Sequence, residues 1–211
     1  MSPLIARGTA SFDPIPAGVH IAICTGVYDL GTHHDQKFNK DTRRLQLVWE
    51  VPEVRGRFER DGLPGDLPQQ ISQQYSLTLN RKANLYKDLS SWRGRAFTEE
   101  ELAGFDLMAV LGKCCQIQVI HHEVEGRTYA NVGTVMSLPK GVTPSAPENP
   151  LLRFSFDDEA PRIPDQTPGW IRNKIEESKE WRVLTNTSDE PARLAEPSGD
   201  SAREEDDDVP F

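Results

Sequence analysis

Cationic and aromatic side chains are interleaved through the middle of this 211-residue sequence. Between His33 and Arg95, twelve Lys and Arg residues stand against eight Asp and Glu residues. Cations of this kind hold the phosphates of a polynucleotide, and aromatic rings stack on unpaired bases whatever their identity. The middle of the chain therefore has the residue types that a nucleic-acid-binding groove requires. The residues that could do this chemistry are Tyr28, Lys37, Phe38, Lys40, Arg43, Arg44, Gln46, Arg55, Arg57, Phe58, Gln74, Ser76 and Tyr129.

The end of the sequence has the opposite charge. Nine acidic residues and only two arginines lie between Ser188 and Phe211, so this stretch holds most of the chain's net charge of -9. With few apolar residues and several Pro, Gly and Ser, it cannot offset the entropy of ordering and is predicted to be disordered. It nevertheless ends in Val209, Pro210 and Phe211, and an acidic tether that carries an aromatic residue is a ready ligand for another protein. A purely solubilising tail is the other interpretation.

Five segments have the alternating or β-rich patterns typical of strands. They are Gly18–Leu30, Thr42–Val51, Ile71–Leu79, Lys113–Val124 and Arg127–Leu138. We expect a polar loop over residues 31–41, a long connection formed by Pro52 and the Gly- and Pro-rich stretch over residues 56–68, and a tight turn at Glu125-Gly126.

Helical patterns interrupt the strands after the third segment. Residues 82–92 place Leu85, Leu89 and Trp92 on one helix face. Thr98 and Glu101 have the spacing of a capping box, which predicts a second short helix. The predicted fold is therefore mainly β, a five-stranded OB-fold Greek-key barrel with a helical connection between strands three and four. A β-sandwich stays open, because periodicity does not reveal strand order.

An OB barrel binds its ligand across strands two and three, between the loops that follow strands one and four. The candidate cations and polar residues fall on these strands and loops, or on the long connection between Pro52 and Pro68. For each arginine, a solvated surface charge is the other interpretation. The aromatic residues divide into those on the apolar face of their strand or helix and those off it or in loops. Those expected in the core are Trp49, Tyr75 and Trp92. Four others are expected to stack on bases: Tyr28, Phe38, Phe58 and Tyr129. Half-buried packing is the other interpretation for each of them.

Three regions follow from these patterns. Residues 1–138 form the expected ligand-binding barrel. Residues 139–187 form a Pro-rich extension whose helix over residues 168–181 would dock on the barrel or on a neighbouring subunit. Residues 188–211 form the acidic tail. The sequence leaves a homo-oligomer open.

The final residues carry a resemblance to a known family. Asp206, Asp207, Asp208, Val209, Pro210 and Phe211 resemble, position by position, the C-terminal tip of bacterial-type single-stranded DNA-binding proteins. The body is more similar to members encoded by phages and other mobile elements, over Leu79–Gly112 and residues 170–180. The resemblance implies a protein that coats single-stranded DNA, without sequence preference, in replication, recombination and repair. It also implies that the tip recruits partner enzymes.

Other functions find less support in the sequence. No pair among the Cys and His residues has the C-x₂-C or H-x₃₋₅-H spacing of a zinc site. The chain has neither a Gly-rich phosphate loop nor a nucleophile elbow, so we expect no enzyme activity, no metal and no cofactor. It also lacks an apolar span and a signal peptide, which predicts a cytoplasmic protein without a membrane partner. The alternative function is an acidic interaction adaptor or a non-catalytic subunit of a replication complex.

Overall fold

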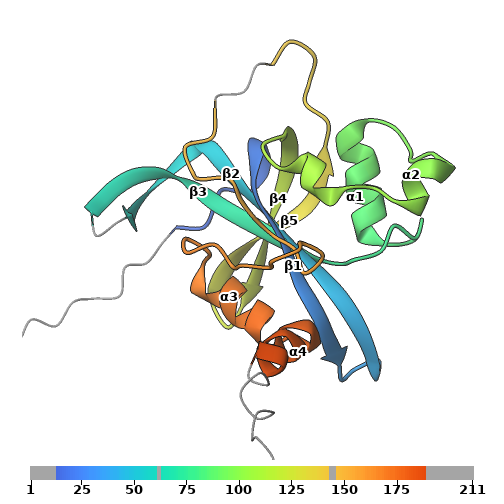
Figure 1. The fold of residues 1–211 in the computed structure, drawn as a ribbon. Coiled ribbons are helices and arrows are strands. Elements are labelled where there is room, and N and C mark those ends of the chain that lie inside the picture. Colours follow the sequence, from blue (N-terminus) through green and yellow to red (C-terminus); the bar gives the residue numbers. More distant parts are fainter. Residues whose placement is uncertain (1–12, 61–62, 143–145, 189–211) are drawn as a thin grey trace, which may run out of the picture.

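The computed structural model describes residues 13–60, 63–142 and 146–188. Over these ranges the chain is mainly β, as expected, with its helices grouped on two sides of one sheet (Figure 1). The acidic tail beyond Ser188, including the tip at residues 206–211, lies outside the described residues. The strands are β1 (Gly18–Asp35), β2 (Lys40–Arg60), β3 (Leu63–Ser76), β4 (Cys114–Val124), β5 (Arg127–Met136) and β6 (Leu152–Phe154).

The six strands form one sheet in the order β3-β2-β1-β4-β5, with antiparallel neighbours. Among the described residues no ladder joins β3 to β5, so the sheet is open. The sixth strand, β6, pairs in parallel with Gly26–Tyr28 of β1. The expectation of five strands missed β6, because three residues are too few for an alternating pattern to emerge.

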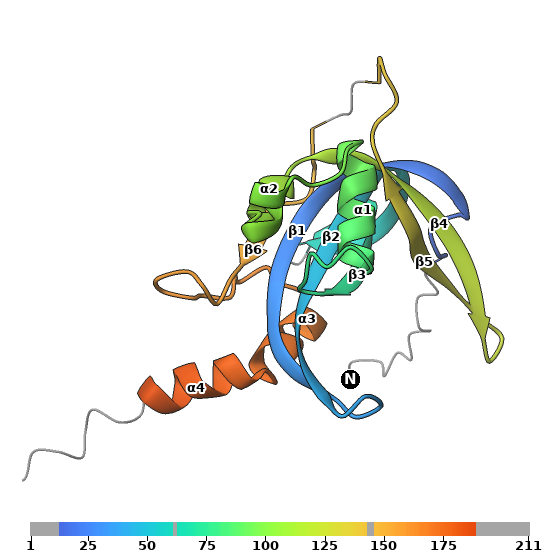
Figure 2. The same ribbon diagram turned by 90° about the vertical axis from the view of Figure 1, so that its right-hand side faces the viewer.

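The central strands are long and irregular, which allows the sheet to curl around its core (Figure 2). The register of β1 against β2 shifts between Cys24 and Gly26 and again between Asp29 and Gly31. Such bulges bend a strand and increase its twist. The pairing of β2 with β3 shifts after Val51, where Pro52 lacks the N–H that a ladder needs.

Two expected loops prove to be strand. The loop over residues 31–41 shrinks to a turn at residues 36–39, because β1 continues to Asp35 and β2 begins at Lys40. The connection over residues 56–68 is a hairpin, in which Arg57 pairs with Asp66. Neither segment has the alternation of apolar and polar residues that indicates a strand, so periodicity did not predict their pairing. The turn at Glu125-Gly126 is confirmed, with positive φ at both residues.

The first core lies between the sheet and α1 (Asn84–Arg93). Trp49, Tyr75 and Trp92 are buried in it, as expected, and Leu85 and Leu89 pack beside them from α1. The short helix α2 (Glu99–Ala103) begins with the expected capping box, and a 3-10 turn, η1 (Leu107–Val110), leads into β4. The helical connection between the third and fourth strands is therefore confirmed.

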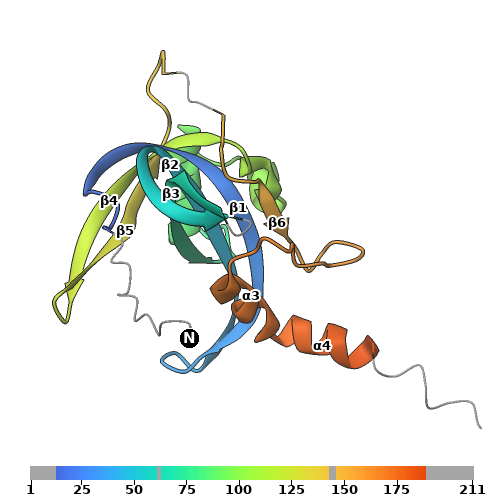
Figure 3. The ribbon, with the colours of Figure 1, turned by 90° about the vertical axis from the view of Figure 1, so that its left-hand side faces the viewer.

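A second core lies on the opposite face of β1 and β2, beneath the C-terminal extension. Apolar side chains of the sheet meet others from β6, the following loop and α3 (Gly169–Glu176). The buried members are Tyr28, Leu30, Val48, Phe154, Ile163, Ile171 and Ile175. The extension thus docks on the sheet of its own chain (Figure 3).

The expected helix over residues 168–181 is in fact two helices. It breaks after Glu176, and α4 (Lys179–Ser188) begins beyond Ser178, whose Oγ accepts a hydrogen bond from the Trp181 N–H at 3.1 Å. The break lets the chain approach Gly31 closely: a Cβ atom there would lie 2.5 Å from the Ser178 Cβ. Gly31 also has φ +72°, so a side chain is disfavoured at this position on both grounds.

Candidate nucleic-acid interface

The tip of the β1–β2 hairpin presents an aromatic ring and two ammonium groups to solvent. Phe38 is 72% exposed, and the Lys37 Nζ lies 5.6 Å from the centroid of its ring. The Asp35 Oδ1 accepts hydrogen bonds from the backbone N–H groups of Lys37 and Phe38, which fixes the turn. Lys40 follows at the start of β2 and is exposed. This hairpin tip, residues 37–40, therefore presents one ring and two ammonium groups to solvent.

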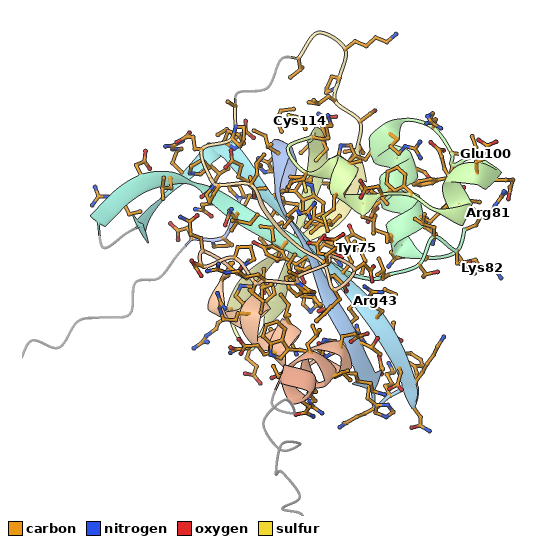
Figure 4. All side chains as sticks on the ribbon, viewed as in Figure 1. Arg43, Tyr75, Arg81, Lys82, Glu100 and Cys114 are labelled. Atoms are coloured by element: carbon orange, nitrogen blue, oxygen red, sulfur yellow. The ribbon has the colours of Figure 1, made fainter. Side chains whose placement is uncertain are left out.

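The two arginines that follow on β2 are held in ion pairs. Arg43, labelled in Figure 4, pairs with the buried Asp29 and, at 3.0 Å, with Asp157 of the extension. The hydrogen bonds to Asp29 raise the pKa of the Arg43 guanidinium above its ordinary value. Arg44 pairs with Asp35 at 3.1 Å. Both guanidinium groups are therefore largely committed to contacts within the chain.

The β2–β3 hairpin carries the next group of expected site residues. Arg55 pairs with Glu148 of the extension and donates a hydrogen bond to the Asp66 carbonyl oxygen at 2.7 Å. Arg57 is exposed two residues further along β2, and Phe58 lies opposite Gly65 in the ladder. The acidic partner of Arg55 lies 93 residues away in sequence, so no local pattern revealed it.

Two expected site residues are buried rather than exposed. Tyr28 is 2% exposed and Gln46 is 3% exposed, because the extension covers this part of the outer face of β1 and β2. Burial also raises the pKa of Tyr28 to about 12. Stacking of a base on the Tyr28 ring is incompatible with this packing. On β3, Gln74 is half-buried opposite Gln46, and Ser76 is exposed opposite Arg44.

Tyr129, one of the residues expected to stack on bases, is partly exposed to solvent. It lies on β5 opposite His122 and is 48% exposed. Arg127, at the start of the same strand, is also exposed and was not among the expected site residues. Its position beside the Glu125-Gly126 turn could have suggested it, since that turn follows the fourth strand. The β4–β5 and β1–β2 hairpins both extend toward the same end of the molecule in Figures 2 and 3.

A cleft of about 660 Å³ lies over the face of the sheet that carries the extension. Its walls come from β1, β2 and β3, from residues 13–15, from residues 128–130 of β5, and from the extension at residues 149–152 and 166–168. Its Thr, Asn and Gln side chains are Thr25, Gln69, Gln70, Thr128, Asn149 and Gln166.

The described lining of this cleft contains no Lys or Arg, and Asp13 is its one acidic residue. The cationic groove expected across strands two and three therefore does not form within the cleft. The expected cations lie outside it, at the hairpin tips, or in ion pairs with acidic residues. The adjacent Gln69 and Gln70 were a local signal for an amide-lined surface, but only the folded chain places them beside Asn149.

A buried carboxylate fixes one wall of the cleft. Glu50 is fully buried and accepts hydrogen bonds from the backbone N–H groups of Glu148, at 3.0 Å, and Asn149, at 2.8 Å. It also accepts one from the Asn149 Nδ2 at 2.9 Å. A buried charge is tolerated when several donors replace its water shell. Glu50 thus ties the extension to the sheet where the cleft begins.

In the described residues, neither the second cavity nor the cysteines favour metal binding or thiol chemistry. A second cavity of about 440 Å³ includes Asp29, Asp157 and Asp158, but Arg153 pairs with Asp158 at 2.8 Å. Within the described ranges no group of three His, Cys, Asp or Glu residues is placed to hold a metal ion. Burial raises the pKa of the Cys24 thiol to about 12, which disfavours a reactive thiolate. None of the described helices has the length and apolar character needed to cross a membrane.

Most of the expected site residues whose side chains are described fall into three groups: exposed, held in ion pairs, and buried under the extension. Of the exposed residues, Tyr129 lines the cleft, which only the tertiary structure reveals. No protein-family model matches the chain, and none of the curated proteins is significantly similar to it.

Proposed function

We propose that this protein binds single-stranded DNA without sequence preference, and that its fold is an OB barrel. One observation carries the proposal: strands in the order β3-β2-β1-β4-β5, with a helical connection between β3 and β4, enclose a cleft on the sheet. OB barrels are five-stranded, partly open and Greek-key in topology, and they bind oligonucleotides on the face of strands two and three.

The two long hairpins support the same proposal. In an OB barrel the loops after strands one and four flank the ligand. Here the β1–β2 tip carries Lys37, Phe38 and Lys40, while Arg127 and Tyr129 lie beside the β4–β5 turn. Exposed rings beside cations are what sequence-tolerant binding of single strands requires.

The acidic tail has a separate role in this proposal. The resemblance of residues 206–211 to the tip of single-stranded DNA-binding proteins supports a ligand for partner proteins in replication, recombination and repair. The barrel would coat the DNA while the tip recruits enzymes. Deletion of residues 206–211 should accordingly leave the affinity for DNA intact.

Fluorescence anisotropy with labelled oligo-dT and with duplex DNA of equal length tests the proposal. We expect clear preference for oligo-dT, and an affinity that falls as salt rises, because phosphate contacts release counterions. Equal affinity for the duplex, or no binding of oligo-dT in dilute buffer, would overturn it.

A second function has one specific observation in its favour. Arg43, Arg44 and Arg55 are all held in ion pairs, which leaves fewer cations for phosphates than the sequence suggested. An acidic adaptor, or a non-catalytic subunit of a replication complex, needs no such cations. Failure to bind oligo-dT would favour this function.

A further inference from the structure

The cleft on the sheet is polar but almost uncharged. Six of its lining residues are Thr, Asn or Gln, and Asp13 is the one acidic residue in the described lining. A phosphate placed there would meet a carboxylate and no cation, and burying an unpaired charge is costly. The cleft therefore suits a ligand group that is neutral and forms hydrogen bonds.

Side-chain amides further define the ligand group. An amide has two N–H donors and a carbonyl acceptor. Gln69 and Gln70 each donate one hydrogen bond within the chain, to the Arg55 carbonyl oxygen and the Thr25 Oγ1, which leaves each a second N–H and the carbonyl oxygen for a ligand. Nucleobases are flat and uncharged, and present mixed donor and acceptor edges that Asn and Gln recognise well. Prolines and aliphatic residues such as Ile15 and Val48 line the rest of the cleft and suit the faces of flat rings. A volume of about 660 Å³ falls in the usual range for a ligand pocket.

The cleft is built from two parts of the chain. On the sheet, the Gln70 Nε2 donates a hydrogen bond to the Thr25 Oγ1 at 3.2 Å, which orients this amide. From the extension, Asn149 is held against the sheet by Glu50, and Gln166 precedes α3. The floor is packed tightly, since a Cβ atom on Gly26 would lie 2.6 Å from the Tyr28 ring.

We propose that this cleft receives unpaired nucleobases, with one wall supplied by the C-terminal extension, while the phosphates stay outside it, near exposed cations such as Arg127, which precedes the lining residue Thr128. This inference rests on the proposed function and deepens it, because it divides the DNA between two chemically different surfaces. Tyr129, half-exposed at the rim, is placed to stack on a base at the entrance.

Comparison of oligo-dT with an abasic oligomer of the same length and backbone tests the inference. The two carry the same phosphates, so only base contacts distinguish them. We expect the full chain to bind oligo-dT about tenfold or more tightly, as stacking and amide contacts to a few bases imply.

Three single variants locate the base contacts. Gln70→Ala, Tyr129→Ala and Gln166→Ala should each weaken oligo-dT binding several-fold and leave the affinity for the abasic oligomer unchanged. All three residues are exposed, so the variants should fold, which thermal unfolding can verify. Gln118→Ala is the matched control, since Gln118 is an exposed amide on β4 outside the cleft.

The possible outcomes separate the two proposals. Equal binding of oligo-dT and the abasic oligomer would overturn the base cleft and leave single-strand binding intact. Loss of affinity for both oligomers in the Gln70 and Tyr129 variants would also overturn it. An unchanged preference in the Gln166 variant would overturn the part assigned to the extension. If the parent protein binds neither oligomer, the proposed function itself fails, and the base cleft with it.

Discussion

The tip of the β1–β2 hairpin and the cleft on the sheet are built from opposite kinds of side chain. The tip carries Lys37, Phe38 and Lys40, which are all exposed to water. The cleft is lined by hydroxyls, amides and apolar groups, without a cation among its described residues. Removing a cation from water carries a desolvation penalty, which an exposed hairpin tip avoids and a cleft does not. The comparison indicates that the cationic groups and the uncharged hydrogen-bonding groups of this molecule lie on different surfaces.

The largest expected effect comes from removing the support of the cleft while leaving the hairpin tip unchanged. Phe154 is buried in the second core, where its ring centroid lies 4.9 Å from that of Phe156. Phe154→Ala should lower the free energy of unfolding by about 3–5 kcal/mol, because it removes a buried ring and leaves a cavity. Urea denaturation measures this loss. Phe38→Ala, which removes an exposed ring, is the control and should leave stability unchanged.

A smaller loss is expected from the carboxylate that ties the extension to the sheet. Glu50→Gln keeps the shape of the side chain but brings an NH₂ group toward three N–H donors. We expect a loss of about 1–3 kcal/mol, since at least one buried donor loses its acceptor. Hydrogen exchange should show faster exchange at the Glu148 and Asn149 amides. If those amides stay protected, Glu50 does not hold this wall. The exposed Glu123 on β4 provides the control, as Glu123→Gln.

The hairpin tip should respond in binding rather than in stability. Replacing Lys37 and Lys40 together by Ala should weaken oligo-dT binding and leave the melting temperature unchanged, because both side chains are exposed. The slope of log affinity against log salt should become shallower by roughly 0.7 for each phosphate that the protein no longer neutralises. An unchanged slope would separate the tip from the phosphates. The variant should still prefer oligo-dT over the abasic oligomer, because the bases are proposed to bind in the cleft.

The smallest effect on binding is expected at a carboxylate far from both surfaces. Glu101 accepts hydrogen bonds from Arg95, the Thr98 N–H and Arg93, and these lower its pKa from 4.5 to about 2. A depressed pKa contributes stability above pH 4.5 that is lost as the pH falls toward 2. Glu101→Gln should therefore reduce the loss of stability across this window and leave oligo-dT binding at pH 7 unaltered. Thermal unfolding from pH 2 to pH 7 measures it.

Local patterns in the sequence predicted much of the framework. Alternation placed Trp49 and Tyr75 in the core, and spacing of four and three placed Leu85, Leu89 and Trp92 on the buried face of α1. The capping box and the Glu125-Gly126 turn were also predictable. Each of these features depends on residues close together in the chain, so their physics can be inferred from spacing alone.

Only the tertiary structure decided what covers the sheet and which cations stay exposed. Tyr28 and Gln46 are buried because a segment more than 100 residues later packs over them, and Arg43 meets Asp157 across 114 residues of sequence. The strand β6 and the cleft likewise exist only where distant segments meet. Burial and ion pairing depend on distance in space, and no periodicity along a chain encodes that distance.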